Sequence, residues 1–270
     1  MTQPPTFSVI IPTLNEEKFL PNLLRSLADQ SKKDFEVIVV DGSSKDKTVT
    51  LAKKFPGVKI IVSKKANLPL QRNLGAKEAR GRWLVFVDAD SILTPYFFER
   101  IVRFIEKKNP PLFTTWAQPD SDDLNDHLYT LLANLVLEGS ILLKRPMAPG
   151  PLSVIHRQTF FSVRGYDEDQ AYNEDIDLGL RLFKKGITLT ILPESLYVWS
   201  MRRIRREGKM KIIQQYVVSA LPILLFKRPL KYLPGYLMGG HLYGEKKPIK
   251  KSLIKTYEKK LKKLMKEIFE

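Results

Sequence analysis

Short apolar runs alternate with amphipathic stretches along the first 110 residues of the chain. The runs are nearly continuous and rich in Val, Ile and Phe, which is typical of strands buried on both faces of a parallel sheet. The stretches between them carry apolar residues every three or four positions, which predicts helices that cover such a sheet. The expected strands are residues 7–11, 35–40, 58–63 and 83–88, and the expected helices are 17–27, 46–55, 70–80 and 94–107.

Local signals indicate where these helices begin and end. Ser43 or Ser44 can cap the second helix, because a serine hydroxyl accepts a hydrogen bond from a free N–H group of the first turn. Thr94 followed by Pro95 is typical of the start of a helix. Gly81 is expected to end the third helix.

The alternation becomes less regular after residue 111. Residues 124–143 form a long apolar stretch that predicts a helix, and a Pro-rich loop follows at 145–151. Asn173 and Gly186 are suited to begin and end a further helix. The other elements expected here are strands at 112–118, 153–155 and 187–192 and a helix at 158–163.

This order of elements predicts an α/β fold in which helices flank a mostly parallel, Rossmann-like sheet. We expect one domain at 1–200, divided near residue 110, and a basic helical extension at 201–270. The last segment of this extension places apolar residues at helical spacing; they are Leu253, Tyr257, Leu261, Leu264 and Ile268.

Composition limits the chemistry that the chain can perform. It contains no cysteine, which excludes disulfides, thiolate metal sites and cysteine nucleophiles. Its three histidines, His127, His156 and His241, are scattered, so a zinc site is not expected, although His156 is a candidate to complete a metal site.

The net charge of +16 is concentrated in the last quarter of the chain. Residues 1–200 contain 26 basic and 24 acidic residues, whereas residues 201–270 contain 19 basic and 5 acidic ones. The basic excess therefore indicates an anionic partner for the extension. The N-terminal sequence lacks the pattern of a signal peptide, and residues 212–226 would span only about 22 Å as a helix, so we expect neither a leader nor a transmembrane helix.

Polar residues follow three expected strands at the point where each strand ends. They are PTLNEE (12–17), DGSSKDKT (41–48) and DADS (88–91). Since the carboxyl ends of parallel strands share one edge of a sheet, these loops are expected to form one ligand site; alternatively, each is only a turn and a helix cap. Of four D-x-D pairs, only Asp88–Asp90 follows an apolar strand, and its carboxylates suit Mg²⁺ held together with substrate phosphates.

Five motifs occur in an order that resembles the inverting glycosyltransferases of family 2, which have the GT-A fold. The motifs are PTLNEE, VDGSSKDKT (40–48), QRNLGAKEARG (71–81), FVDADS (86–91) and NEDIDLGLRLFKKG (173–186). The resemblance covers roughly residues 7–200. It implies a catalytic domain at 1–200, with a nucleotide-sugar-binding half at 1–110 and an acceptor-binding half at 111–200.

The resemblance implies that the first loops bind a UDP- or GDP-sugar donor. Asp41 would pair with the base edge, Asp90 would bind Mg²⁺ or Mn²⁺ directly, and Asp88 would contact the ribose or a metal-bound water. Leu14 stands where many relatives carry an aromatic residue, which leaves the base open. Arg72 would lie near the base or diphosphate, or alternatively is a solvated helix residue. The implied donor-binding set is Pro12, Thr13, Asn15, Glu16, Asp41, Ser43, Arg72, Asp88, Asp90, Arg202 and Arg203.

Glu174 and Asp175 are the catalytic residues that the resemblance implies. Asp175 would be the general base that takes a proton from the acceptor, and we expect the N-terminus of its helix to keep it ionised at neutral pH. The helix dipole also explains acidic residues in a first turn without any catalytic role. A base favours a hydroxyl acceptor, on a glycan or a lipid-linked molecule, over a polyprenyl phosphate, which is already anionic.

Arg202 and Arg203 open the basic extension. Paired hydrogen bonds from arginine suit phosphate oxygens, so both are expected to bind the diphosphate unless they form only a solvated face. The mixture of apolar and basic residues that follows favours an anionic membrane surface as the partner. Packing on the catalytic domain is one alternative; nucleic acid is another, but no recognised nucleic-acid motif occurs.

The sequence thus predicts an inverting, metal-dependent glycosyltransferase that is cytoplasmic and peripheral at the inner face of the cell membrane. A polyprenyl-phosphate glycosyltransferase is the alternative within the same class of enzyme. A non-catalytic module that binds nucleotide or membrane on the same fold is the alternative from another class.

Overall fold

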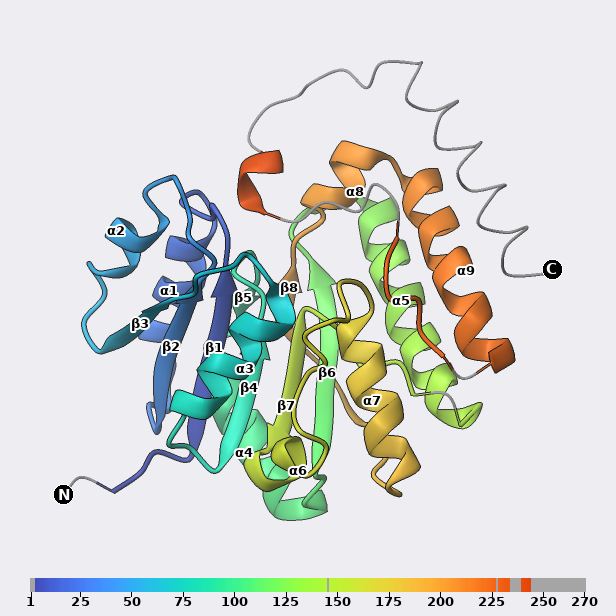
Figure 1. Ribbon diagram of the computed structural model, residues 1–270, viewed down its shortest axis with the longest axis horizontal. Coiled ribbons are helices and arrows are strands. Elements are labelled where there is room, and N and C mark those ends of the chain that lie inside the picture. Colours follow the sequence, from blue (N-terminus) through green and yellow to red (C-terminus); the bar gives the residue numbers. More distant parts are fainter. Residues whose placement is uncertain (1–2, 145, 227, 234–238, 244–270) are drawn as a thin grey trace.

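The computed structural model describes residues 3–144, 146–226, 228–233 and 239–243. An eight-stranded sheet with strand order β3-β2-β1-β4-β7-β6-β8-β5 forms its centre (Figure 1). The strands are β1 (Phe7–Thr13), β2 (Phe35–Asp41), β3 (Val58–Val62), β4 (Trp83–Val87), β5 (Ile92–Leu93), β6 (Leu112–Pro119), β7 (Leu152–His156) and β8 (Thr190–Trp199).

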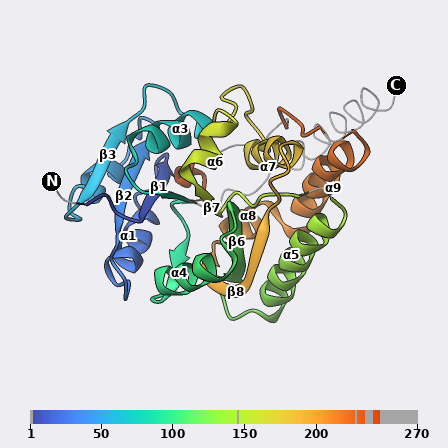
Figure 2. The same ribbon diagram turned by 90° about the horizontal axis from the view of Figure 1, so that it is seen from below.

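Helices cover both faces of the sheet, as Figure 2 shows from below. One buried apolar cluster joins α1 and α4 to the sheet, and a second cluster on the other face joins α3, α6 and α7 to it. The helices are α1 (Leu20–Ala28), α2 (Thr48–Ala52), α3 (Leu68–Glu78), α4 (Phe97–Lys108), α5 (Leu124–Leu142), α6 (Arg157–Ser162), α7 (Glu174–Lys184), α8 (Arg202–Glu207) and α9 (Lys209–Phe226), followed by a 3₁₀ turn at Gly240–Tyr243.

The first half of the sheet is parallel, as its continuous apolar runs predict. β1 pairs in parallel with β2 and β4, and β2 pairs in parallel with β3. The second half is mixed, because β7 is antiparallel to both β4 and β6, while β6 and β8 are parallel. Parallel pairing of β1, β2 and β4 places their carboxyl ends at one edge of the sheet.

The last expected strand differs most from its prediction, since β8 occupies 190–199 rather than 187–192. The N–H of Ile187 donates to the carbonyl of Leu182 at 3.1 Å, so this residue belongs to the turn that ends α7. β8 also continues beyond Pro193, and its pairing with β6 shifts register between Thr115 and Ala117. This irregularity accommodates a proline, which has no N–H to donate.

Several residues that the sequence predicts to begin or cap a helix do not do so in the structure. Ser43 and Ser44 precede α2 by several residues, and α4 begins at Phe97 rather than at Thr94. Asn173 does precede α7, but with a φ of 59° and no capping hydrogen bond from its side chain. Gly186 has a φ of 79°, which confirms its role as the residue that ends α7.

Gly81 lies beyond the end of α3 and is needed for a different reason from the one predicted. A Cβ at this position would lie 2.6 Å from the backbone carbonyl carbon of Phe7. The glycine therefore lets the segment between α3 and β4 pass directly against the start of β1.

The extension begins with α8 and α9, and α9 packs against α7 and the segment before it. Val218 joins Tyr172 in one buried cluster, and Ile223 joins Ile176 in another. None of the helices in the described part of the chain is long and apolar enough to cross a membrane. The predicted apolar positions from Leu253 to Ile268 lie outside the described residues, and the division at residue 200 stays a prediction.

Candidate functional site

A pocket of about 680 Å³ lies at the carboxyl ends of β1 and β4 and is also lined by residues of α5, α7, α8 and α9. Most of the predicted site residues line it, although they come from distant parts of the sequence. They are Pro12, Thr13, Glu16, Arg72, Asp88, Asp90, Glu174, Asp175, Arg202 and Arg203.

Asn15, Asp41 and Ser43 instead hold together the loops behind the pocket wall. The buried carboxylate of Asp41 accepts hydrogen bonds from the N–H of Ser44 at 2.8 Å and from the hydroxyl of Thr13 at 3.1 Å. The N–H of Asn15 donates to the hydroxyl oxygen of Ser44 at 2.7 Å, and the Ser43 hydroxyl donates to a carbonyl just after β3 at 2.7 Å. The first two polar loops are therefore bonded to each other.

Gln71 is a residue of this wall that sequence reasoning missed. Its side chain is 3% exposed, and its amide nitrogen donates to the carbonyls of Thr13 at 2.9 Å and Val40 at 2.7 Å. Gln71 thus joins the carboxyl ends of β1 and β2. Its position as the first residue of the QRNLGAKEARG motif was the available signal.

Arg72 is buried, so the alternative of a solvated helix residue is wrong. Its guanidinium donates to Glu174 at 2.7 Å and to Asp88 at 3.0 Å, and also to the carbonyl of Gly150 at 3.0 Å. It also lies 5.2 Å from the centre of the Tyr166 ring. Arg72 therefore connects the end of β4 to the start of α7 and to the Pro-rich loop.

Asp88 and Asp90 differ in their surroundings. Asp88 is partly exposed and pairs with Arg72, whereas Asp90 is more enclosed and pairs with the Nε of Arg202 at 2.7 Å. Burial raises the pKa of Asp90 to about 7; Arg202 opposes this effect, and the nearby carboxylates of Asp88 and Glu16 add to it. The negative charge of this cluster is therefore only partly compensated by arginine.

Arg202 brings the basic extension onto the first polar loop. Its guanidinium donates to both carboxylate oxygens of Glu16, at 2.7 and 2.8 Å, and lies 4.5 Å from the centre of the Phe19 ring. Burial raises the pKa of Glu16 despite this pairing. Arg203 lines the same pocket, and its Nε lies 3.7 Å from Glu207 on α8.

Glu174 and Asp175 begin α7 and have raised pKa values. Burial raises the pKa of Glu174, and Arg72 counteracts this increase. Burial and the adjacent Glu174 raise the pKa of Asp175 to about 8, although a backbone hydrogen bond from Ile176 at 2.9 Å favours its ionised form. Burial and the charge of Glu174 therefore oppose the helix N-terminus, which was expected to keep Asp175 ionised at neutral pH.

Asn173 was predicted to cap α7, and the structure shows that it lines the pocket. It is 9% exposed, and its left-handed backbone is unusual for a residue other than glycine. Within the described residues, its buried Nδ2 has no hydrogen-bond partner. A buried donor that lines a pocket beside Asp175 is suited to bind a substrate oxygen.

The aspartates after β4 fit a hard divalent cation in the type of their ligand atoms. The described part of the chain holds no group of three or more His, Asp or Glu residues that could enclose a metal ion. Mg²⁺ commonly takes only one or two carboxylates and completes its shell with phosphate oxygens and water. The uncompensated charge around Asp90 fits such an ion held jointly with a bound diphosphate.

The half of the pocket away from Asp88 and Asp90 is mainly apolar, and it was not predicted from the sequence. Leu132 and Val136 of α5 face Ile176 of α7 and Val217 and Ile223 of α9 across it. The helical spacing of these residues predicts the helices, but it does not predict which residues each helix contacts. The pocket therefore joins a charged half to an apolar half.

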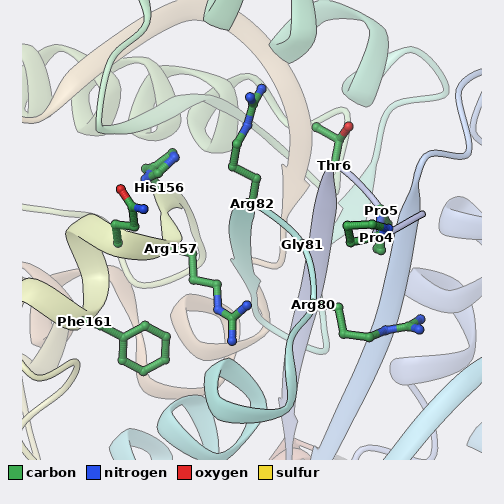
Figure 3. Close-up of a pocket in the computed structure, with 10 residues that line it drawn as sticks. Pro4, Pro5, Thr6, Arg80, Gly81, Arg82, His156, Arg157 and Phe161 are labelled. Atoms are coloured by element: carbon green, nitrogen blue, oxygen red, sulfur yellow. The ribbon is translucent and has the colours of Figure 1, made fainter. Parts of the chain in front are cut away.

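A second pocket, of about 730 Å³, lies at the opposite ends of β1 and β4 (Figure 3). His156 lies here, far from Asp88 and Asp90, and its ring packs against Trp83 with centroids 5.1 Å apart. Arg80 and Arg82 point in different directions in Figure 3 and do not converge on one point. His156 therefore does not complete the predicted metal site.

The fold matches that of solved glycosyltransferase structures, which confirms the expected GT-A architecture. A structure of residues 1–349 of TarS from S. aureus in complex with UDP-GlcNAc superposes with a TM-score of 0.60 at 21% identity, over 72% of this chain and 58% of that TarS chain. The mannosyltransferase PcManGT from Pyrobaculum calidifontis, in complex with GDP-Man and Mn²⁺, superposes with a TM-score of 0.62 at 18% identity, over 82% of this chain and 65% of PcManGT.

The chain belongs to glycosyl transferase family 2, whose sequence profile matches residues 8–162. Its relatives include an uncharacterized glycosyltransferase of Haemophilus influenzae, 28% identical over 66% of this chain, and the uncharacterized glycosyltransferase EpsJ of Bacillus subtilis, 25% identical over 72% of this chain. The matched regions make up only 62% and 61% of these two relatives.

Proposed function

We propose that this chain is an inverting, metal-dependent glycosyltransferase that moves a sugar from a nucleoside-diphosphate donor to a hydroxyl acceptor. The observation that carries the proposal is the meeting of Asp88 and Asp90, at the end of β4, with Asp175 of α7 around one pocket. Membership of glycosyl transferase family 2 supports the same reaction class.

The donor occupies the charged half of the pocket. UDP-GlcNAc is bound by TarS and GDP-Man by PcManGT, which supports a UDP- or GDP-sugar for this chain. Asp90 and Asp88 would hold Mg²⁺ or Mn²⁺, which would neutralise the charge that develops on the diphosphate leaving group. Arg202 and Arg203 donate hydrogen bonds to the diphosphate oxygens.

Asp175 is the general base, and Glu174 positions it. The acceptor oxygen attacks the anomeric carbon from the side opposite the diphosphate, so the configuration at this carbon inverts. The new carbon–oxygen bond forms while the bond to the diphosphate breaks, and the acceptor proton passes to the Asp175 carboxylate. Glu174 is bound to the buried Arg72 at 2.7 Å, which fixes the turn that carries Asp175.

The acceptor is a lipid-linked molecule, because the other half of the pocket is apolar. Leu132, Val136 and Ile223 surround the space beyond Asp175 and offer burial to an alkyl or prenyl group. We place the reaction in the cytoplasm, at the inner face of the cell membrane, where such acceptors are inserted. The basic composition of residues 201–270 supports this location.

The proposal is tested by the thermal stability of the protein with UDP, GDP and their sugars, each with and without Mn²⁺. We expect one nucleotide series to raise the melting temperature by several degrees, and only when Mn²⁺ is present, since ligands that bind the folded state stabilise it. The matching donor should then be hydrolysed slowly in the presence of Mn²⁺.

Asp90→Asn should lose the Mn²⁺-dependent stabilisation, whereas Asp122→Asn, a change in another D-x-D pair that does not line the pocket, should keep it. Stabilisation by no nucleotide would contradict the proposal. Stabilisation without any donor hydrolysis or transfer would support the non-catalytic nucleotide-binding module instead.

A further inference from the structure

Helix α5 buries polar residues against the protein and exposes a row of leucines to the solvent, although its half-buried Leu137 and Ile141 pack against an apolar cluster. Its four buried positions are all polar, with exposed fractions of 7% or less. A helix on the outside of a globular protein normally buries its apolar side. The buried positions are Asp126, Thr130, Asn134 and Ser140.

Specific hydrogen bonds fix this inverted orientation. The side chain of Asn134 accepts from the N–H of Ala117 at 3.1 Å and donates to the carbonyl of the same residue at 3.0 Å. Asp126 accepts from the hydroxyl of Ser121 at 2.7 Å and pairs with Lys209 of α9 at 3.3 Å. These contacts bind α5 to the adjoining strand β6 and to α9, so the helix cannot turn its apolar side inward without losing them.

The outer side of α5 forms a continuous stripe of leucines, which we call the leucine face. Its residues follow one another at intervals of three, four or seven positions, so they share one side of the helix. Their exposed fractions range from 45% to 85%. A contiguous apolar patch of this kind on a soluble surface indicates a surface for a partner or a membrane. The leucine face consists of Leu124, Leu128, Leu131, Leu135 and Leu142.

We propose that the leucine face docks on the surface of a bilayer that contains anionic lipid, with the C-terminal ends of α5 and α9 directed toward the headgroups. Figures 1 and 2 show these two helices side by side. Lys144 follows α5, and Arg228 and Lys231 follow α9; all three are exposed. Apolar insertion beside basic residues is the pattern that binds proteins to anionic membrane surfaces.

The charge of the chain favours a bilayer over a second copy of the protein as the occupant of this face. Each copy carries a net charge of +16, so two copies repel each other where their basic regions meet. An anionic bilayer attracts the same charge. The exposed acidic residues next to α5, Asp122 and Asp123, precede Leu124 at the N-terminal end of the leucine face, opposite the end that carries Lys144.

Docking through the leucine face also orients the active-site pocket. Leu132 and Val136 lie beside this face, are 60% and 54% exposed, and line the pocket. The mouth of the apolar half therefore opens next to the membrane surface. This inference builds on the proposed membrane-bound acceptor, but its deciding readout is vesicle binding, which does not depend on transfer.

The test is flotation of the full chain with vesicles made of equal parts phosphatidylcholine and phosphatidylglycerol, compared with phosphatidylcholine alone. We expect the unmodified protein to float with the anionic vesicles and to be released by high salt. Leu128→Ser, Leu131→Ser and Leu135→Ser combined should weaken binding about tenfold or more, because three inserted side chains are lost. None of the three residues lines the pocket, so the nucleotide-dependent thermal shift should be unchanged.

A matched control replaces three exposed apolar residues elsewhere, Val62, Tyr96 and Phe161, by serine and should float as the unmodified protein does. Equal flotation of the leucine variant and the control would overturn the proposal. A dimer that the leucine variant converts to monomer would show that a second copy covers the face and would also overturn the proposal.

Discussion

At the residue scale, the proposed catalytic groups are two adjacent carboxylates at the start of α7, Glu174 and Asp175. Arg72 compensates the charge of Glu174, whereas Asp175 lies at the pocket, forms no ion pair within the described residues and has a pKa of about 8. Two neighbouring carboxylates whose surroundings differ in this way are suited to different tasks. One holds the helix start in place, and the other exchanges a proton.

Asp175→Asn is expected to lower the transfer rate by about a hundredfold or more, because an amide cannot accept the acceptor proton. Binding of the donor should remain, since Asp175 does not contact the proposed metal ligands. The matched control is Asp177→Asn in the same helical turn, where Asp177 pairs with Arg181 at 2.7 Å outside the pocket. Nearly full transfer by Asp175→Asn would remove the proposed base.

The raised pKa of Asp175 gives the reaction a predicted pH dependence. A general base acts only in its deprotonated form, so kcat/KM for the acceptor should rise with pH and level off above about 8. Glu174→Gln removes a neighbouring negative charge and should move this inflection to lower pH. A profile that is flat from acidic to alkaline pH would contradict the assignment.

At the scale of elements, α8 is joined to the first polar loop by one side chain. Arg202 bonds to both oxygens of Glu16 and to Asp90, and all three side chains are largely buried. The pairing crosses most of the sequence and places the basic extension against the donor site. The length and spacing of the elements gave no indication of this contact.

Arg202→Ala is expected to lower the free energy of unfolding by about 3 kcal/mol, because it leaves two enclosed carboxylates without their cation. It should also weaken nucleotide-dependent stabilisation. Denaturant titration measures the first effect. Arg205→Ala is the control, since Arg205 is about half exposed in its pair with Asp120 and should contribute about 1 kcal/mol or less. Equal losses for both variants would contradict the special role of Arg202.

The spacing of apolar residues in α5 predicts a helix but does not predict which side of that helix is buried. The sequence correctly predicts a helix at 124–143, because its apolar residues recur at helical spacing. The period does not say which side faces the sheet when leucines occur on several sides. Asn134 and Asp126 decided this by finding polar partners on β6, on the segment after it and on α9.

At the scale of the whole molecule, parallel pairing of β1, β2 and β4 brings three polar strand ends to one edge of the sheet. Helix α7 and the extension then close this edge from the other side with Asp175 and Arg202. The charged half of the pocket thus comes from the first hundred residues and two distant segments. The apolar half comes mainly from the helices of the second part.

The sequence by itself determined the strands and most helices of the first half, because buried strands and amphipathic helices impose their own periods. It also determined the candidate carboxylates, because Asp88 and Asp90 follow an apolar run and family motifs surround them. These features depend on neighbours in the chain. They are therefore visible without knowledge of any long-range contact.

Only the tertiary structure decided the partners of each group. It showed Arg72 buried between Asp88 and Glu174, raised the pKa of Asp175 against the expected effect of its helix, and placed His156 at the far end of the sheet. Burial and charge pairing depend on residues that are distant in sequence, so no local pattern specifies them. The same reason explains why an apolar helix such as α5 turned its leucines outward.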